Sequence, residues 1–263
     1  MKTGIYYWFG YPLPGRERMR LIASAGFDCV SLWWGDEYAA ENGPREALPG
    51  LARESGLLVE NIHAPFSRTN LLWQDKAGWE DVLERSLQCV DACREHDIPV
   101  MVLHLTVGET PPPPNLLGVE RIRRIVERAG EKGVTIALEN LRKPEYMGYV
   151  FERIDSDHLR FCYDSGHENC FQGQKGLLRT YGDRLTCLHL HDNDGTADQH
   201  LLPGEGTIPW AQVTADLAWL GYGGSISLEV TNAFSEVHRD MPAEDFLAEA
   251  FRRADALAGG IMV

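Results

Sequence analysis

The stretch "GVERIRRIVERAGEKGVTIALEN", residues 118–140, contains a helix, a stop signal and a strand in succession. Its first half has apolar residues at helical spacing, and the pair Lys132-Gly133 ends that pattern. The apolar run that follows, residues 134–140, has the length and composition of a buried strand. Repetition of this unit along the chain decides the fold.

Apolar, β-branched or aromatic runs occur at residues 4–9, 29–34, 57–64, 99–105, 134–140, 159–165, 185–192 and 225–230. Amphipathic helical patterns occur at residues 16–27, 79–98, 118–133, 208–224 and 242–258. Eight strands that alternate with helices predict an α/β fold, a (β/α)8 TIM barrel formed by a single domain over residues 1–263. An open doubly wound sheet is the alternative, but "GYPLPGRE" after the first run is not the Gly-rich phosphate turn common there.

The chain of 263 residues has 39 acidic and 25 basic residues and a net charge of −14. Because Lys and Arg supply most of the affinity for a phosphate backbone, this balance argues against a nucleic-acid partner. No apolar run reaches the roughly 18 residues that a membrane span requires. The first residues, "MKTGIYYWFGYPLPG", lack the apolar core of a signal peptide. We therefore expect a cytoplasmic protein without a membrane partner.

The six cysteines form no CxxC pair, so we expect buried, reduced thiols and no thiolate zinc site. These residues are Cys29, Cys89, Cys93, Cys162, Cys170 and Cys187.

Residues that can bind a metal gather where the predicted strands end, which is where TIM barrels carry their active sites. They are His63, His104, Glu139, Asp164, His167, His189, His191, Asp198, His200 and Glu229. Glu139, Asp164 and Glu229 each end an apolar strand, where an unpaired buried charge costs several kcal/mol. A divalent cation would relieve the repulsion among them, so the sequence predicts a metal centre at this rim.

Imidazole and carboxylate ligands without thiolates favour Zn²⁺, Mn²⁺, Co²⁺ or Fe²⁺. Glu139, Asp164, His189 and Glu229 provide four ligands on strands five to eight, enough for one ion with positions open to substrate. His191 has the same strand parity as His189 and is expected to contact substrate or to support the ligands.

The segment "TADQHLLPGEG", residues 196–206, places Asp198 and His200 two residues apart. From the spacing alone, Asp198 and His200 are either metal ligands or residues of a polar surface loop. Glu205 in the same segment is expected to be a feature of the turn rather than an acid catalyst.

Two further residues are expected to contact substrate. The loops after the first three strands contain few Lys or Arg, and Arg68 near the "HAPF" motif is the exception. Trp34 belongs to an aromatic-rich rim that suits stacking on a sugar ring. The other members of that rim are Trp8, Trp33, Phe66 and Trp73. Burial in the core, or a subunit contact in a homo-oligomer, is the alternative for these aromatic residues.

The motifs "HAPF", "LEN", "YDSGH", "HLHDND", "PGEG" and "LEV" follow one another in this order. In them the chain resembles the xylose isomerase-like TIM barrel superfamily of sugar and sugar phosphate isomerases and epimerases, which includes endonuclease IV-like enzymes. The ketose 3-epimerase-like branch implies one Mn²⁺ or similar ion held by Glu139, Asp164, His189 and Glu229. It also implies that both glutamates exchange protons with a metal-bound enediolate and that His167 contacts the substrate.

The endonuclease IV-like branch implies a cluster of three zinc ions that activates water and clamps phosphate oxygens. Every ligand position of that branch is filled, by His63, His104, Glu139, Asp164, His167, His189, Asp198, His200 and Glu229. The family resemblance thus implies that Asp198 and His200, with His167, hold an additional metal ion or remain as polar contacts beside a one-metal centre.

The expected function is a metal-dependent isomerase or epimerase of a small sugar or sugar phosphate, with one to three Zn or Mn ions. Glu139, Glu229 and His167 are the expected catalytic residues. A multi-zinc phosphodiesterase that cleaves an abasic site or a small phosphoester is the alternative. A metal-dependent sugar-binding barrel without catalysis is a third hypothesis.

Overall fold

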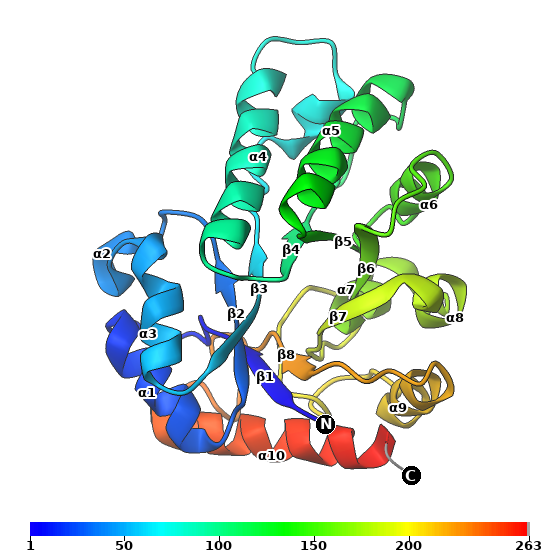
Figure 1. Ribbon diagram of the computed structural model, residues 1–263. Helices are drawn as coiled ribbons and strands as arrows, with labels where there is room; N and C mark the ends of the chain where they lie inside the picture. The colour runs from blue at the N-terminus through cyan, green and yellow to red at the C-terminus, as the bar shows by residue number, and fades with distance from the viewer. Residues whose placement is uncertain (262–263) are drawn as a thin grey trace.

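A computed structural model describes residues 1–261, and its centre is a ring of eight parallel strands surrounded by helices (Figure 1). The strands pair in the order β7-β6-β5-β4-β3-β2-β1-β8. Their bounds are β1 Thr3–Tyr6, β2 Cys29–Trp33, β3 Leu58–His63, β4 Val100–Leu103, β5 Thr135–Glu139, β6 Leu159–Asp164, β7 Leu185–His189 and β8 Ile226–Leu228. Each of the eight predicted runs therefore overlaps one strand, and only β1 begins outside its run, by one residue.

The first and last strands in this order meet through a short link that closes the barrel. Leu190, just past β7, forms a parallel bridge with Leu228 of β8. The Leu190 N–H donates to the Ser227 carbonyl at 2.9 Å, and the Glu229 N–H donates to the Leu190 carbonyl at 2.9 Å. The predicted TIM barrel is thus confirmed; residues 262 and 263 of the predicted domain lie outside the described residues.

All five predicted amphipathic stretches form helices, although their ends differ by a few residues. They are α1 Gly15–Ala25, α4 Trp79–Glu95, α5 Leu116–Lys132, α9 Trp210–Trp219 and α10 Ala243–Ile261. The remaining helices are α2 Ala39–Asn42, α3 Leu48–Glu54, α6 Glu145–Phe151, α7 Ser165–His167 and α8 Leu177–Tyr181. These are too short to show a helical period in the sequence.

Helix α5 shows how the sequence sets these boundaries. The Asn115 side chain accepts a hydrogen bond from the Gly118 N–H at 3.0 Å and caps the first turn. Gly133 ends the helix with φ of 69°, a left-handed conformation that favours glycine. Between these two ends, Ile122 and Ile125 face the barrel and are fully buried. The cap, the terminal glycine and the apolar face of α5 can thus all be read from the sequence.

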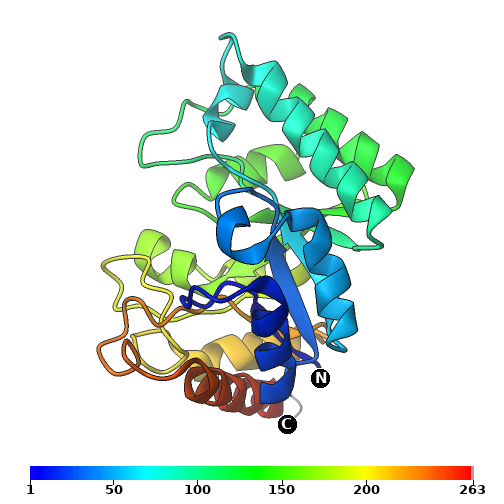
Figure 2. The same ribbon diagram turned by 90° about the vertical axis from the view of Figure 1, so that its left-hand side faces the viewer.

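The loops that follow β4, β7 and β8 gather on one side of the molecule, away from both chain termini (Figure 2). This side is the C-terminal mouth of the barrel, where the predicted metal-binding residues end their strands. Among the described residues no helix is long and apolar enough to cross a membrane. The six cysteines are all free thiols, five of them buried and Cys170 partly buried.

Candidate metal centre

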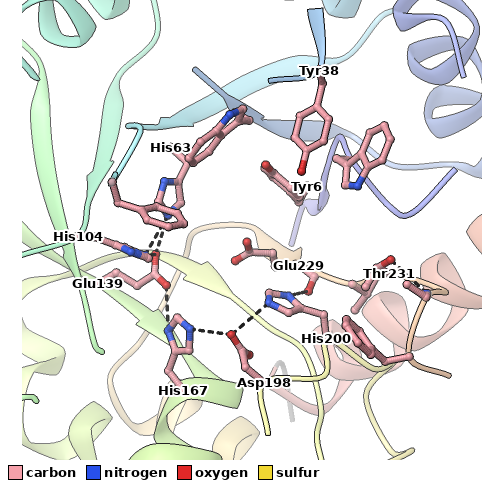
Figure 3. A pocket seen from close by; sticks show the side chains of 16 residues that line it. Tyr6, Tyr38, His63, His104, Glu139, His167, Asp198, His200, Glu229 and Thr231 are labelled. Carbon is pink, nitrogen blue, oxygen red and sulfur yellow. Dashed lines mark hydrogen bonds and ion pairs between the residues drawn. The ribbon is translucent and has the colours of Figure 1, made fainter. Parts of the chain in front are cut away.

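A cavity of about 390 Å³ opens at the C-terminal mouth of the barrel. Polar residues from six strands, β3 to β8, and their loops form its base, and aromatic residues form its walls (Figure 3). The polar residues are His63, His104, Glu139, His167, Asp198, His200 and Glu229. Seven of the predicted metal-binding side chains therefore share one cavity, while Asp164 and His189 lie buried beside it.

Glu139, at the end of β5, lies among four imidazoles. Its Oε2 is 3.2 Å from His63 Nε2, 3.3 Å from His104 Nε2 and 3.1 Å from His189 Nδ1. Its Oε1 is 3.0 Å from His167 Nδ1. The Glu139 side chain is only 1% exposed, so a carboxylate and several ring nitrogens share a space from which water is excluded.

A second group of contacts comes from the loop between β7 and α9. Asp198 Oδ2 lies 3.2 Å from His167 Nε2 and 3.5 Å from His200 Nε2. The Nδ1 of His200 contacts the backbone carbonyl of Glu229 at 2.7 Å, which leaves its Nε2 directed at Asp198. His200 has φ of 49°, a strained value for a residue with a side chain, and such strain persists where surrounding contacts enforce it.

His189, Glu229 and Asp164 complete the group around Glu139. His189 Nδ1 is 2.9 Å from Glu229 Oε2. One ligand atom from each of Glu139, Asp164, His189 and Glu229 lies within 4.8 Å of the others. This is the four-residue set that the sequence predicts for one ion.

Within the described residues, several buried atoms of this group make no hydrogen bond. They are both ring nitrogens of His189 and Oε2 of Glu139. Buried polar atoms without partners are rare in folded proteins, because each one costs about 1–3 kcal/mol. A divalent cation would satisfy these atoms together, and carboxylate and imidazole are suitable ligands for it. The donor set therefore fits a metal ion.

The carboxylates of Glu139 and Glu229 are held in their charged form. Burial alone would raise the pKa of Glu139, but the adjacent His104 and His189 outweigh burial and keep that pKa well below its usual range. Burial would likewise raise the pKa of Glu229, and His189 outweighs it and lowers the pKa. Anionic ligands at neutral pH suit a cation.

Asp164 is fixed by its neighbours on both sides. The Asn140 side chain donates to the Asp164 carbonyl at 2.8 Å and accepts from its N–H at 2.7 Å. Asp164 also caps the short helix α7, because its Oδ1 accepts from the His167 N–H at 2.6 Å. The motifs "LEN" and "YDSGH" thus act together to orient one carboxylate.

His191 lies behind the cavity and is fully buried, so the structure does not place it in contact with the cavity. Its Nε2 is 3.2 Å from Asp164 Oδ1 and 3.5 Å from Asp198 Oδ1. Its ring stacks on His200 with centroids 4.0 Å apart. Of the two roles expected for His191, this position matches support of the ligands, since zero exposure leaves no room for substrate.

The structure also places Arg68 and Trp34 outside the cavity. Arg68 has a side chain that is 57% exposed and lies 4.0 Å from Asp81. Trp34 packs against His96 on the outside of the barrel. Trp33 lines the cavity instead, because neighbouring residues along a strand point to opposite sides and Trp33 is the residue that ends β2.

Several residues of the cavity wall are not predicted from the sequence: Tyr6, Tyr38, Val230, Thr231, Ala233 and Phe234. Tyr6 ends β1, and its strand parity is the signal that could have identified it. Tyr38 and Phe234 lie in loops, for which the sequence offers no such signal. Among the described residues, neither Lys nor Arg lines this cavity.

Comparison with known sequences extends these observations. A family model described as xylose isomerase-like TIM barrel matches residues 19–254. An uncharacterized protein of Mycobacterium bovis is 33% identical over 279 aligned positions, covering 97% of this chain and 96% of that protein. The D-psicose 3-epimerase of Enterocloster bolteae is 24% identical over 259 positions, covering 87% of this chain and 82% of that enzyme.

The fold is also similar to that of solved structures. The D-psicose 3-epimerase of Clostridium cellulolyticum H10, crystallised with D-tagatose, superposes with a TM-score of 0.79. The match covers 99% of both chains at 19% sequence identity. At this identity the superposition establishes the common barrel and leaves the substrate of this chain to be argued from its own residues.

Proposed function

The chain belongs to the xylose isomerase-like TIM barrel family, and on that premise we propose that it is a metal-dependent isomerase or epimerase of a small sugar. The observation that carries the proposal is the position of Glu139 and Glu229, which lie 3.1 and 2.9 Å from the same nitrogen of His189 at the base of the cavity. The names of similar proteins, D-psicose 3-epimerase among them, support a sugar substrate.

Glu139, Asp164, His189 and Glu229 would hold a divalent cation. When bound, such an ion polarises a carbonyl and its neighbouring hydroxyl and so acidifies the C–H bond between them. A carboxylate next to that carbon then removes the proton, and an enediolate forms. Return of the proton to the opposite face inverts the carbon, whereas return to the neighbouring carbon isomerises the sugar.

The two glutamates differ in how open they are to a substrate. The side chain of Glu229 is 15% exposed, whereas that of Glu139 is 1% exposed and surrounded by imidazoles. We therefore assign the first proton removal to a carboxylate oxygen of Glu229. Glu139 is a metal ligand and supplies or accepts the proton on the other face, and His167, which lines the same cavity, contacts the sugar.

The cavity wall favours an uncharged sugar over a sugar phosphate. Tyr6, Trp8, Trp33, Tyr38 and Phe66 surround the polar base. Aromatic faces and edges pack against the C–H groups of a sugar ring, whereas a phosphate group usually requires Arg or Lys. The described lining contains neither of these cations.

Proton exchange with solvent tests this proposal. The Mn²⁺-loaded protein is incubated in D₂O with D-psicose, D-tagatose and D-fructose, and loss of each carbon-bound proton is followed by NMR. We expect exchange next to the carbonyl of at least one ketose, and Glu229→Gln should slow it by roughly 10²–10⁴-fold. Glu249→Gln, on α10 outside the cavity, is the matched control. Absence of exchange with all three ketoses, alongside hydrolysis of bis(p-nitrophenyl) phosphate, would overturn the proposal.

A second candidate, a multi-zinc phosphodiesterase, is favoured by one further observation. His63 Nε2 lies 3.2 Å from His104 Nε2, and both face Glu139, so additional ligands adjoin the four-residue group. Asp198 and His200 extend the set on the opposite side. Several metal ions held in this way would clamp phosphate oxygens without help from Arg or Lys.

A further inference from the structure

The loop that connects β8 to α10, residues 229–242, forms one wall of the cavity. Val230, Thr231, Ala233 and Phe234 of this loop line it. Phe234 is 58% exposed and Val237 is 76% exposed, so apolar burial contributes little to holding the tip of the loop in place. The tip of the loop therefore depends mainly on polar contacts.

Glu205, in the "PGEG" turn of the β7–α9 loop, provides these contacts. Its Oε1 lies 2.6 Å from His238 Nδ1, and its Oε2 accepts a hydrogen bond from the Ser235 hydroxyl at 3.3 Å. The Ser235 hydroxyl also accepts from the His238 N–H at 3.1 Å. Ser235 and His238 are 3% and 5% exposed. One carboxylate thus joins two loops that are far apart in sequence.

The turn that carries Glu205 is itself anchored. Arg253 of α10 donates to the Pro203 carbonyl at 2.6 Å. The β8–α10 loop is closed on itself as well, because the Asn232 side chain donates to the Arg239 carbonyl at 2.9 Å. The start of the β8–α10 loop is hydrogen-bonded to the β7–α9 loop, because the Thr231 N–H donates to the His200 carbonyl at 2.9 Å. Glu205 therefore lies between two segments that are each internally fixed.

The cluster of Ser235, His238 and Glu205 has the composition of a hydrolytic triad but not its geometry. A triad uses one ring nitrogen for the acid and the other for the nucleophile. Here His238 Nδ1 faces both Glu205, at 2.6 Å, and the Ser235 hydroxyl, at 3.2 Å. Glu205 and Ser235 are also absent from the cavity lining. The cluster can position a loop but cannot deliver a nucleophile to substrate.

We propose that Glu205 is a positioning residue: its carboxylate holds Ser235 and His238 and thereby fixes the β8–α10 loop as the wall that presents Thr231 and Phe234 to the substrate. The identity of that substrate rests on the proposed function. The position of the loop does not depend on the proposed function, so the role of Glu205 and the identity of the substrate can be tested separately.

Amide hydrogen exchange followed by mass spectrometry on the full-length protein measures the loop directly and requires no substrate. Glu205→Ala should raise the exchange rate of amides in residues 231–241 by roughly tenfold or more, because the close contact with His238 and the hydrogen bond from Ser235 are lost together. The strands of the barrel should exchange as in the unsubstituted protein. Glu205→Gln, which retains an acceptor, should restore most of the protection.

Glu54→Ala is the matched control, because Glu54 of α3 contacts Arg16 at 2.5 Å and has no contact with the loop among those the structure describes. Unchanged exchange of the loop in Glu205→Ala would overturn the proposal. A uniform rise over the whole barrel would also overturn it, since the carboxylate would then serve only general stability. If Glu205→Ala does not fold, Ser235→Ala replaces it, with the same selective rise expected and the same two contrary results.

Steady-state kinetics distinguishes the positioning role of Glu205 from the proposed isomerase or epimerase activity. With whichever ketose shows solvent exchange, Glu205→Ala should raise KM several-fold and change kcat little, because the wall moves and the proton-transferring groups do not. A fall in kcat at constant KM would contradict the positioning role. If no ketose exchanges a carbon-bound proton with D₂O, the proposed function fails. Amide hydrogen exchange of the protein still decides the role of Glu205 in that case.

Discussion

The two halves of the candidate metal centre are built differently. His63, His104 and Glu139 are at or next to the ends of adjacent strands, and the pairing of the barrel strands fixes their backbone. Asp198 and His200 lie in the β7–α9 loop, with side chains 29% and 25% exposed, against 1% for Glu139. The strand-borne half is rigid before any ligand binds, whereas the loop-borne half depends on contacts among its own side chains.

The two halves also differ in how burial and neighbouring charges shift the pKa values of their histidines. Burial dominates at His104 and lowers its pKa, even though Glu139 lies beside it. At His200 burial is outweighed by the hydrogen bond to Asp198, which raises the pKa to about 9. In the absence of metal, the strand-borne half therefore presents a neutral imidazole, and the loop-borne half presents an imidazolium paired with a carboxylate.

Glu139→Gln is expected to have the largest effect, a loss of affinity for a divalent metal ion. This change removes one negative charge from a position in contact with four imidazoles. We expect the affinity for Mn²⁺, measured by isothermal titration calorimetry, to fall by at least about a hundredfold. Glu60→Gln is the control, since Glu60 lies in β3 and contacts Ser31 at 3.3 Å, away from the cavity. Equal affinities in Glu139→Gln and the unsubstituted protein would show that the strand-borne half is not the metal site.

A smaller effect is expected on the titration of the metal-free protein. His200 should titrate near pH 9, and Asp198→Asn should move its pKa down towards the ordinary value of about 6.5. Because this pKa is raised on folding, the stabilisation by the pair is complete below about pH 6.5 and is lost as the pH rises through 9. His104 should remain neutral at pH 7 in both proteins. NMR of histidines labelled with ¹⁵N measures the pKa values of His200 and His104. An identical His200 titration in the Asp198→Asn and unsubstituted proteins would contradict the pairing of His200 with Asp198.

The same division explains what the sequence could predict. Strand ends follow from apolar runs, so Glu139, Asp164 and His189 could be placed at one mouth of the barrel before its geometry was known. Trp34 shows the limit of that approach, because β2 ends one residue earlier and the strand parity directs Trp33 to the cavity instead.

Contacts between loops could not be predicted from the sequence. Glu205 and His238 are 33 residues apart, and only the folded loops bring them within 2.6 Å. Tyr38 and Phe234 reach the cavity for the same reason. The strand parity of His189 and His191 predicted only that both could point inward; the complete burial of His191 depends on the packing of Gly166, where a Cβ atom would lie 1.9 Å from the His191 ring.

The number of metal ions per chain tests the central claim most directly. Three of the buried atoms that make no hydrogen bond belong to His189 and Glu139, and one further such atom is Oδ1 of Asp198. Both ring nitrogens of His167, by contrast, have protein partners, the Asn140 carbonyl and Asp198. We therefore predict that the protein, dialysed after loading with Mn²⁺ or Zn²⁺, retains one ion per chain by inductively coupled plasma mass spectrometry. Asp198→Asn should also retain one. Three zinc ions per chain, with at least one lost in Asp198→Asn, would contradict the one-metal isomerase or epimerase and favour the phosphodiesterase.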